Sequence, residues 1–274
     1  MQTTDVPPAS SAERPRTGIM NGRLWGSRAD DWSALQEPLV APAYEAAFTR
    51  AGVTTGTRLL DVGCGAGLAA QRAARRGAQV SGIDASDALL TIARSRVPGA
   101  EFQVGDIEQL PFGDSSFDLV TGFNAFQYAA NPARALAEAC RVTRNNGRVV
   151  VMTWGRPEGM EAAQLVAALR PVLPPSPPGA PGPFALSDET TLRAFALESG
   201  LHVLEIFDTE TPWQYADLPT ALRGLKSSGV AVRAMEHSGE AAVDDAHAKA
   251  LAPFRRPDRS YRINATFRCL LAQV

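Results

Sequence analysis

The stretch Leu59-Leu60-Asp61-Val62-Gly63-Cys64-Gly65-Ala66-Gly67 decides the fold of this chain. A short apolar run leads into a turn with glycine at every second position, and an Ala-rich segment follows, so we expect a strand, a tight turn and a helix. Glycine tolerates a positive φ at a chain reversal, and its missing Cβ lets a ligand approach the backbone. The free N–H groups and the positive dipole end of the following helix point into the space above the turn. The turn therefore indicates a site of nucleotide size, although a Gly-rich turn can also serve tight packing alone.

Strands and helices alternate on the carboxyl side of this turn. The pattern predicts strands over 57–62, 79–83, 100–104, 117–122 and 148–154, separated by helices that include 67–76, 87–96 and 131–144. Such alternation is typical of a parallel sheet covered by helices on both sides, and right-handed crossovers make it doubly wound. Further along we expect helices over 161–169 and 187–199, a sixth strand over 201–209 and a last strand over 262–272. The predicted fold is α/β, a Rossmann-like, mainly parallel seven-stranded sheet.

Composition excludes several classes of function. The formal net charge is -2, so no global field favours nucleic acid as a partner. No apolar run approaches the ~20 residues that a membrane span needs, and the amino-terminal segment has no secretory apolar region. Three scattered cysteines, Cys64, Cys140 and Cys269, give neither a disulfide framework nor metal-ligand spacing, so we expect no metal. We expect a cytoplasmic protein without membrane or nucleic-acid partners, and the pattern does not indicate an oligomeric state.

Three aspartates follow the first three predicted strands: Asp61, Asp84 and Asp106. In an open α/β sheet, ligands bind at the edge where these strands end. Asp84 lies about twenty residues beyond the glycine turn, where a carboxylate can accept from both ribose hydroxyls. Position 68 is leucine and not the third glycine of the dinucleotide fingerprint. Asp106 is a further polar group placed to read a base edge, and a pyrophosphate would not require it.

Taken together, these motifs resemble those of the class I S-adenosylmethionine-dependent methyltransferases, in particular a small-molecule branch similar to the quinone-biosynthesis enzymes. Residues 59–67 match the first motif of that family, Gly82-Ile83-Asp84-Ala85-Ser86 is similar to its ribose-binding motif, and 105–112 is similar to its adenine-binding motif. Residues 117–120 and 139–148 resemble its fourth strand and its R-V-L-K-P-G-G segment, with Asn145-Asn146 in place of the usual Pro-Gly. The resemblance is strong over about 20–154 and weak beyond.

The resemblance implies a role for each of several residues toward S-adenosylmethionine. The backbone of the turn should face the methionine moiety and the ribose, Asp61 should anchor the turn and contact the amino group, and Asp84 should hold the ribose hydroxyls. Ala85 should lie against adenine, while Asp106 and the Ile107 N–H should bind its edge. The full set of expected donor-binding residues is Asp61, Gly63, Cys64, Gly65, Gly67, Asp84, Ala85, Asp106, Ile107, Asn124, Gln127, Trp25 and Arg28. Asn124 and Gln127 should line the methyl end, and Trp25 and Arg28, with Trp32, should close over the methionine end.

Methyl transfer from a sulfonium is an in-line displacement, so the protein mainly positions the reacting atoms. A general base is needed only if the nucleophile must lose a proton. No catalytic residue follows from the motifs, and His237, His247 and Tyr128 are candidates for that role, whereas His202 is expected to be packed or exposed. The aromatic residues of 123–128 favour an apolar or aromatic acceptor, with O, N, C and S all open as its reacting atom.

Composition and residue patterns also suggest a division of the chain. We expect a disordered tail over 1–18, a helical cap over 19–56 that includes an amphipathic helix over 38–51, and a methyltransferase domain over 57–274. A helical insertion over about 213–253 should form a substrate lid. The predicted function is methylation of a small-molecule acceptor, and a role in specialised metabolism is plausible. Two alternatives stay open: a non-methylating cyclisation or rearrangement on the same fold, and a non-catalytic subunit that binds the donor.

Overall fold

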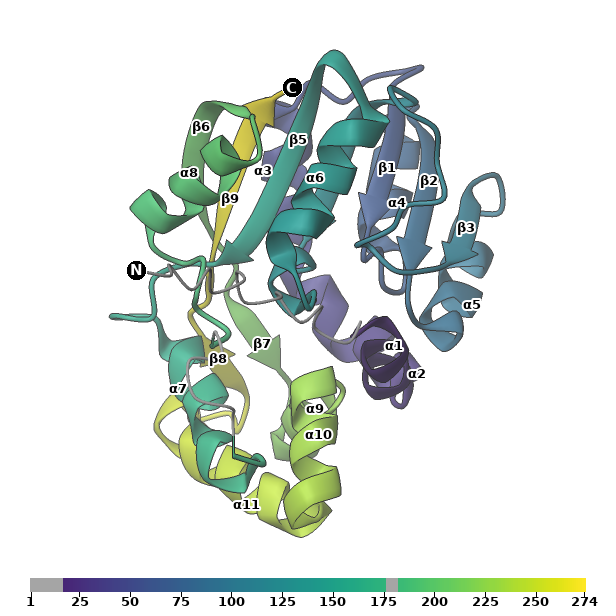
Figure 1. Cartoon of the computed structure of the whole chain (residues 1–274). Coiled ribbons are helices and arrows are strands. Elements are labelled where there is room, and N and C mark those ends of the chain that lie inside the picture. Colours follow the sequence, from purple (N-terminus) through teal and green to yellow (C-terminus); the bar gives the residue numbers. More distant parts are fainter. Residues whose placement is uncertain (1–16, 176–181) are drawn as a thin grey trace, which may run out of the picture.

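A seven-stranded sheet forms the centre of the molecule in the computed structural model, which describes residues 17–175 and 182–274 (Figure 1). The strand order is β3-β2-β1-β4-β5-β9-β6; strands β1 to β5 are parallel to one another, and β9 is antiparallel to both β5 and β6. The strands are β1 (Arg58–Val62), β2 (Gln79–Asp84), β3 (Glu101–Val104), β4 (Phe117–Phe123), β5 (Thr143–Trp154), β6 (His202–Glu210) and β9 (Thr266–Gln273). The predicted fold class, a Rossmann-like and mainly parallel seven-stranded sheet with a helical amino-terminal segment, is confirmed.

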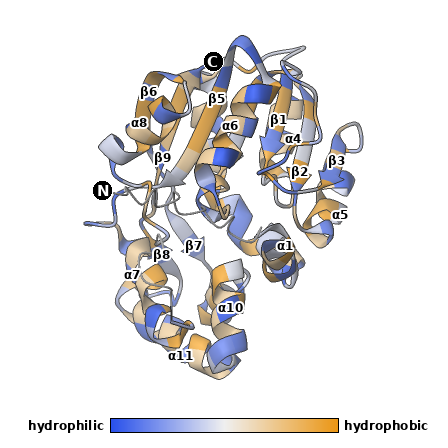
Figure 2. Cartoon of the chain, in the orientation of Figure 1, coloured by the Kyte–Doolittle hydropathy of each residue, from blue (hydrophilic) through white to orange (hydrophobic). Residues whose placement is uncertain are grey.

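Helices cover both faces of this sheet because its central strands are apolar on both sides. Leu59 and Leu60 are neighbours in β1, and each is fully buried in a different one of the two main cores. Residues of α3, α4 and α5 pack in the first core, and residues of α6 and α8 in the second. These helices are α3 (Ala41–Arg50), α4 (Leu68–Arg75), α5 (Asp87–Arg96), α6 (Pro132–Val142) and α8 (Glu189–Glu198). Figure 2 shows the apolar colour running along β5 at the centre of the sheet.

A second group of elements lies beyond the carboxyl edge of the sheet, below it in Figure 1. Between β6 and β9 the chain forms β7 (Trp213–Tyr215), α9 (Leu218–Lys226), α10 (Gly229–Ser238), α11 (Glu240–Leu251), η5 (Ala252–Phe254) and β8 (Tyr261–Ile263). Antiparallel pairing of β7 with β8 closes the base of this segment. Two elements that follow β5 join it, α7 (Glu161–Ala168) and η4 (Arg170–Val172), and nearby Leu169 shares a buried cluster with residues of α10 and α11. We call this group the lid.

The amino-terminal segment is helical and crosses the same edge of the sheet. It consists of α1 (Gly18–Gly26), α2 (Ala29–Asp31), the π-helical turn η1 (Trp32–Gln36), the 3-10 turn η2 (Glu37–Val40) and then α3. The helix predicted over 38–51 therefore becomes regular only at Ala41, because Pro38 and Pro42 lack backbone N–H groups. Of the tail predicted over 1–18, residues 1–16 lie outside the described residues and Gly18 begins α1.

Two predicted boundaries are wrong. The helix predicted over 131–144 ends at Val142, and β5 begins five residues before the expected 148, because Thr143 is already extended and pairs with Phe117 of β4. The last strand predicted over 262–272 is two strands, β8 and β9, that belong to different sheets. The chain leaves the lid between them, where buried Ala265 accepts a backbone hydrogen bond from Thr211. Across the described ranges, no helix combines the length and the apolar character needed to cross a lipid bilayer.

Candidate functional site

A cavity of about 1430 Å³, its open mouth included, lies where the carboxyl edge of the sheet meets the lid and the amino-terminal segment. One end is formed by the glycine turn and the ends of β2 and β3, and the other by aromatic and aliphatic side chains of β5, α7, β7, α9 and β9. The first end is lined by Gly18, Asn21, Trp25, Trp32, Gly63, Gly65, Asp84, Ala85, Leu89, Gly105, Asp106 and Ile107. We call it the donor end and the other the apolar end.

The glycine turn takes the conformation that its sequence indicates. Gly63 has φ +68°, and a Cβ there would lie 2.6 Å from the Cβ of Ala125, so only glycine fits. Gly63 and Gly65 both line the cavity. Gly67, with φ +80°, precedes α4 and packs against Ala93 on the side away from the cavity.

Asp84 and Asp106 meet at the donor end because β2 and β3 are adjacent and parallel. Oδ2 of Asp84 accepts from the Gly65 N–H at 2.9 Å, and Oδ1 accepts from the Ser86 N–H at 2.9 Å. Burial raises the pKa of Asp84, and these backbone hydrogen bonds oppose that shift. Oδ1 of Asp106 accepts from the Glu108 N–H at 2.9 Å. Both carboxylates are thus fixed by backbone donors and turned toward one ligand-sized space.

Asp61 lies beneath the turn and does not line the cavity. Its Oδ1 accepts from the hydroxyl of Thr121 at 2.8 Å, and the residue is buried. Loss of water raises the pKa of Asp61 to about 7; the Thr121 hydrogen bond opposes the shift, and the charges of Glu37 and Asp84 add to it. The structure places Asp61 where it supports the turn from within.

Five of the other predicted residues divide between those that line the cavity and those that lie behind its wall. Asn124, with φ +53°, lines the cavity just after β4. Gln127 does not line it, and its Nε2 donates to Oδ1 of Asn124 at 2.9 Å. The side chain of Cys64 is buried away from the cavity, whereas Ala85 and Ile107 line the donor end as expected.

Helix α1 lies directly on the loops of the donor end. A Cβ at Gly22 would lie 2.1 Å from the carbonyl oxygen of Ala85, and one at Gly26 would lie 2.3 Å from Oγ of Ser86. One at Gly18 would lie 3.2 Å from Oδ2 of Asp106. Three glycines at i, i+4 spacing therefore let the helix backbone approach the site closely.

Trp25 and Trp32 close the donor end from the amino-terminal segment. Their rings meet edge to face with centroids 5.0 Å apart, and both line the cavity. Arg28, predicted to face the donor, does not line the cavity and instead pairs with Glu240 of the lid at 2.9 Å. Trp25 and Trp32 thus lie at the site as the sequence predicted. Arg28 instead connects the amino-terminal segment to the lid.

Sequence reasoning missed a buried ion pair below the tryptophans. Glu37 is almost fully buried, accepts from the Leu68 N–H at the start of α4 at 3.2 Å, and pairs with Arg96. Arg96 also donates to the carbonyl oxygens of Ala66 and Ser33, each at 2.9 Å. This pair ties the amino-terminal segment to the glycine turn. The one sequence signal was a lone Glu before Pro38, which marks no motif.

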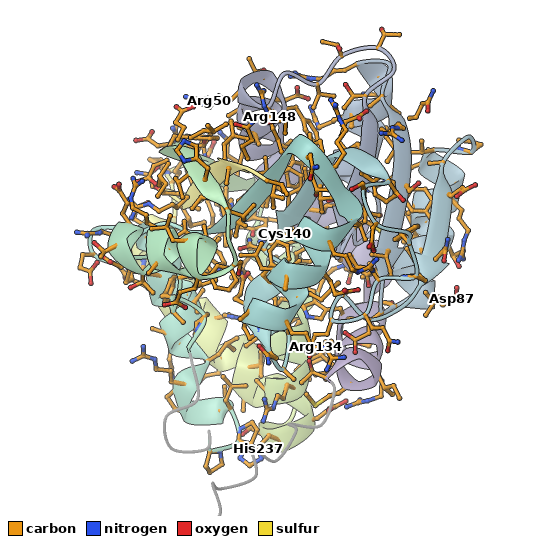
Figure 3. All side chains as sticks on the ribbon, turned by 45° about the horizontal axis from the view of Figure 1, so that its top comes forward. Arg50, Asp87, Arg134, Cys140, Arg148 and His237 are labelled. Atoms are coloured by element: carbon orange, nitrogen blue, oxygen red, sulfur yellow. The ribbon has the colours of Figure 1, made fainter. Side chains whose placement is uncertain are left out.

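The three catalytic candidates lie in different surroundings. Tyr128 lines the cavity, and burial raises its pKa to about 12, with a hydrogen bond from Trp154 opposing the shift. His247 of α11 is buried and lines the cavity, and burial lowers its pKa to about 4. His237 is exposed on α10, far from the sheet in Figure 3, and does not line the cavity. The structure thus brings Tyr128 and His247 to the cavity and leaves His237 outside it.

The comparison with protein families agrees with this geometry. Residues 60–151, from β1 to β5, match the family model described as a methyltransferase domain. By this match, residues 60–151 form a methyltransferase domain. The methyltransferase domain therefore contains the glycine turn, Asp84 and Asp106, and the lid lies outside the match.

Relatives of the methyltransferase domain include quinone-biosynthesis enzymes. The chain is 38% identical over 106 residues to a demethylmenaquinone methyltransferase of Renibacterium salmoninarum, which covers 39% of this chain and 45% of that one. It is 32% identical over 175 residues to an uncharacterized protein of Mycobacterium tuberculosis, with 62% of each chain covered. The chain thus matches less than two thirds of either relative's length.

The cyclase SpnF, a solved structure, shares the fold of the methyltransferase domain. It superposes with a TM-score of 0.56 at 22% identity, covering 84% of this chain and 80% of SpnF.

Proposed function

We propose that this protein transfers a methyl group from S-adenosylmethionine to an apolar small-molecule acceptor. The observation that carries the proposal is that the carboxylates of Asp84 and Asp106 both line the cavity beside the glycine turn. The same cavity continues into an apolar end. One bound ligand can reach both carboxylates and the turn, and a second can occupy the apolar end next to it.

The residues present fit the donor at each of its polar groups. Asp84 would accept from the ribose hydroxyls, and Asp106 and the Ile107 N–H would bind the adenine edge, with Ala85 against its face. The backbone at Gly63, Cys64 and Gly65 would hold the methionine end, supported by Asp61. The donor supplies an electrophilic methyl group when bound. Trp25 and Trp32 would exclude water from that end, which strengthens polar contacts there.

The apolar second compartment of the cavity supports a small molecule and not a polymer as the acceptor. Its described lining includes Trp154, Trp213 and Phe267. The similarity to the Renibacterium protein, a demethylmenaquinone methyltransferase, supports a cyclic apolar acceptor for this chain as well. A near-neutral formal charge of -2 gives no attraction to nucleic acid.

Donor bearing a labelled methyl group tests the proposal directly. The full chain is incubated with the labelled donor and a metabolite extract, and both label in the organic products and demethylated donor are measured. Labelled product supports methyl transfer, whereas converted but unlabelled product would instead support cyclisation or rearrangement. Absence of any turnover, with donor bound, would indicate a binding subunit.

Calorimetry with demethylated donor tests whether the chain binds the donor at all, which all three of these outcomes assume. Binding should also stabilise the fold, by about 2.7 kcal/mol at a ligand concentration of 100 Kd. If neither the donor nor its demethylated product binds, the proposed function is wrong.

A further inference from the structure

His247 is a buried imidazole that makes no hydrogen bond with any described residue. It is 2% exposed, and its Nδ1 is shielded from water and has no partner among the described residues. The side chain nevertheless lines the cavity. A ligand bound in the cavity can therefore contact the imidazole ring at the wall, whereas Nδ1 itself is too deeply buried to be reached.

The surroundings of His247 limit what such a ligand can be. The described residues that line the apolar end include Trp154, Leu165, Val166, Leu169, Trp213, Leu225, Val230 and Phe267. None of the described lining residues is Lys or Arg, and the only acidic ones, Asp84 and Asp106, lie at the donor end. A carboxylate acceptor would find no cation here, and an ammonium would find no carboxylate. A neutral aromatic ring that carries a hydroxyl group matches both the apolar wall and the single imidazole.

Charged groups near His247 decide its protonation. Asp244 precedes it by three residues on α11, and Lys226 of α9 contacts Asp244 at 3.0 Å and Glu240 at 2.7 Å. Burial lowers the pKa of His247 to about 4; the Asp244 charge opposes the shift and the Lys226 charge adds to it. The imidazole is therefore neutral at neutral pH and can accept a proton.

We propose that His247 is the general base for O-methylation of an apolar aromatic hydroxyl compound. This inference rests on the proposed function and names the acceptor class for the same cavity. The hydroxyl oxygen attacks the methyl carbon with a lone pair, and the carbon–sulfur bond breaks with its electron pair left on sulfur. The hydroxyl proton passes to an imidazole nitrogen of His247, which later releases it to water. A weak base suffices, because an oxygen that gains a methyl group while still protonated becomes strongly acidic.

Two phenols of different acidity test this role. The full chain with S-adenosylmethionine is assayed with 2-naphthol, which is neutral near pH 7, and with 4-nitrophenol, which is largely ionised at about pH 8. His247→Asn should lower kcat for 2-naphthol by about 100-fold or more, the usual contribution of a general base. Methylation of ionised 4-nitrophenol should fall far less. His247→Gln gives a second variant, and His202→Asn, an exposed histidine at the start of β6, is the matched control.

The pH profile distinguishes a base from a packing residue. With 2-naphthol, the rate of the wild-type chain should fall only as the pH drops toward the low pKa of the imidazole. The rate of both His247 variants should instead rise with pH as the naphthol itself ionises. Equal losses for the two phenols with an unchanged pH profile would overturn the proposal.

Donor binding separates this inference from the proposed function. Calorimetry with demethylated donor should give the same affinity for the wild-type chain and both His247 variants. If the donor binds but neither phenol is bound and methylated, the acceptor class is wrong and the methyltransferase proposal stands. If the donor does not bind the wild-type chain, the proposed function itself fails.

Discussion

At the scale of single residues, we expect Asp84 to be the side chain on which donor binding most depends. Its two oxygens are held by the N–H groups of Gly65 and Ser86 and lie at the cavity wall. Asp84→Asn removes the charge and should weaken binding of demethylated donor by about 1.5–3 kcal/mol, roughly 10- to 150-fold in Kd. Calorimetry measures the change, with Asp87→Asn as the control, because Asp87 is 71% exposed on α5 (Figure 3). Equal affinities for the two variants would show that Asp84 does not hold the ribose.

Asp61 gives a prediction about stability and pH. Its pKa in the folded chain is about 7, against an ordinary value of 3.8, so between these values the folded state holds a proton that the unfolded state has lost. The free energy of unfolding due to this group is therefore greatest below about pH 4 and falls as the pH rises to about 7, by up to ~1.4 kcal/mol per pH unit.

The variant Asp61→Asn isolates that contribution. Asparagine keeps an oxygen that can accept from the Thr121 hydroxyl, and it does not titrate. Urea unfolding of both chains at several pH values should show the variant gaining stability relative to the wild type between about pH 4 and pH 7. Stability curves that stay parallel over this range would rule out a titrating Asp61.

At the scale of elements, the contact of α1 with the donor end depends on Gly22. A side chain there would meet the Ala85 carbonyl oxygen at 2.1 Å, so Gly22→Val should push α1 away from the β2–α5 loop. We expect at least about tenfold weaker donor binding, a loss of about 1.4 kcal/mol, together with a lower Tm. Ile19→Ala, at a 93% exposed position of the same helix, should change neither quantity. Unchanged donor affinity in Gly22→Val would mean that α1 does not help to close the site.

Some elements and contacts of the fold could be predicted from the sequence, and others could not. The first four parallel strands and the placement of Asp84 and Asp106 follow from local signals, since apolar runs and glycine turns act over a few residues. Pairing of β7 with β8 joins residues about fifty positions apart, and no local pattern encodes it. The contact between Glu37 and Arg96 likewise arises only when the amino-terminal segment folds onto α4 and α5. Burial of His247 depends on the lid as a whole, so the sequence alone could name it only as one candidate of three.

At the scale of the whole molecule, ion pairs connect the amino-terminal segment to the lid across the cavity. Arg23 pairs with Glu236, Arg28 with Glu240, and Arg223 with Asp31. Each pair has at least one largely exposed partner, so salt should weaken it. Because both segments cover the donor end or the cavity mouth, we expect the proposed donor to enter, and its product to leave, when these contacts open.

Neutralising two of these pairs should therefore speed product release. In the double variant that combines Asp31→Asn and Glu236→Gln, we expect demethylated donor to dissociate faster at low salt and the amides of α1 to exchange faster. Added salt should change these two rates little further. The wild-type chain should approach the behaviour of the variant as ionic strength rises, since screening removes the same attractions. Asp245→Asn is the control, because its pair with Lys249 lies within α11 and joins no separate parts of the fold. If salt accelerates release equally in the variant and the wild-type chain, these contacts do not hold the cavity closed, and the tryptophans and the glycine face of α1 must do so.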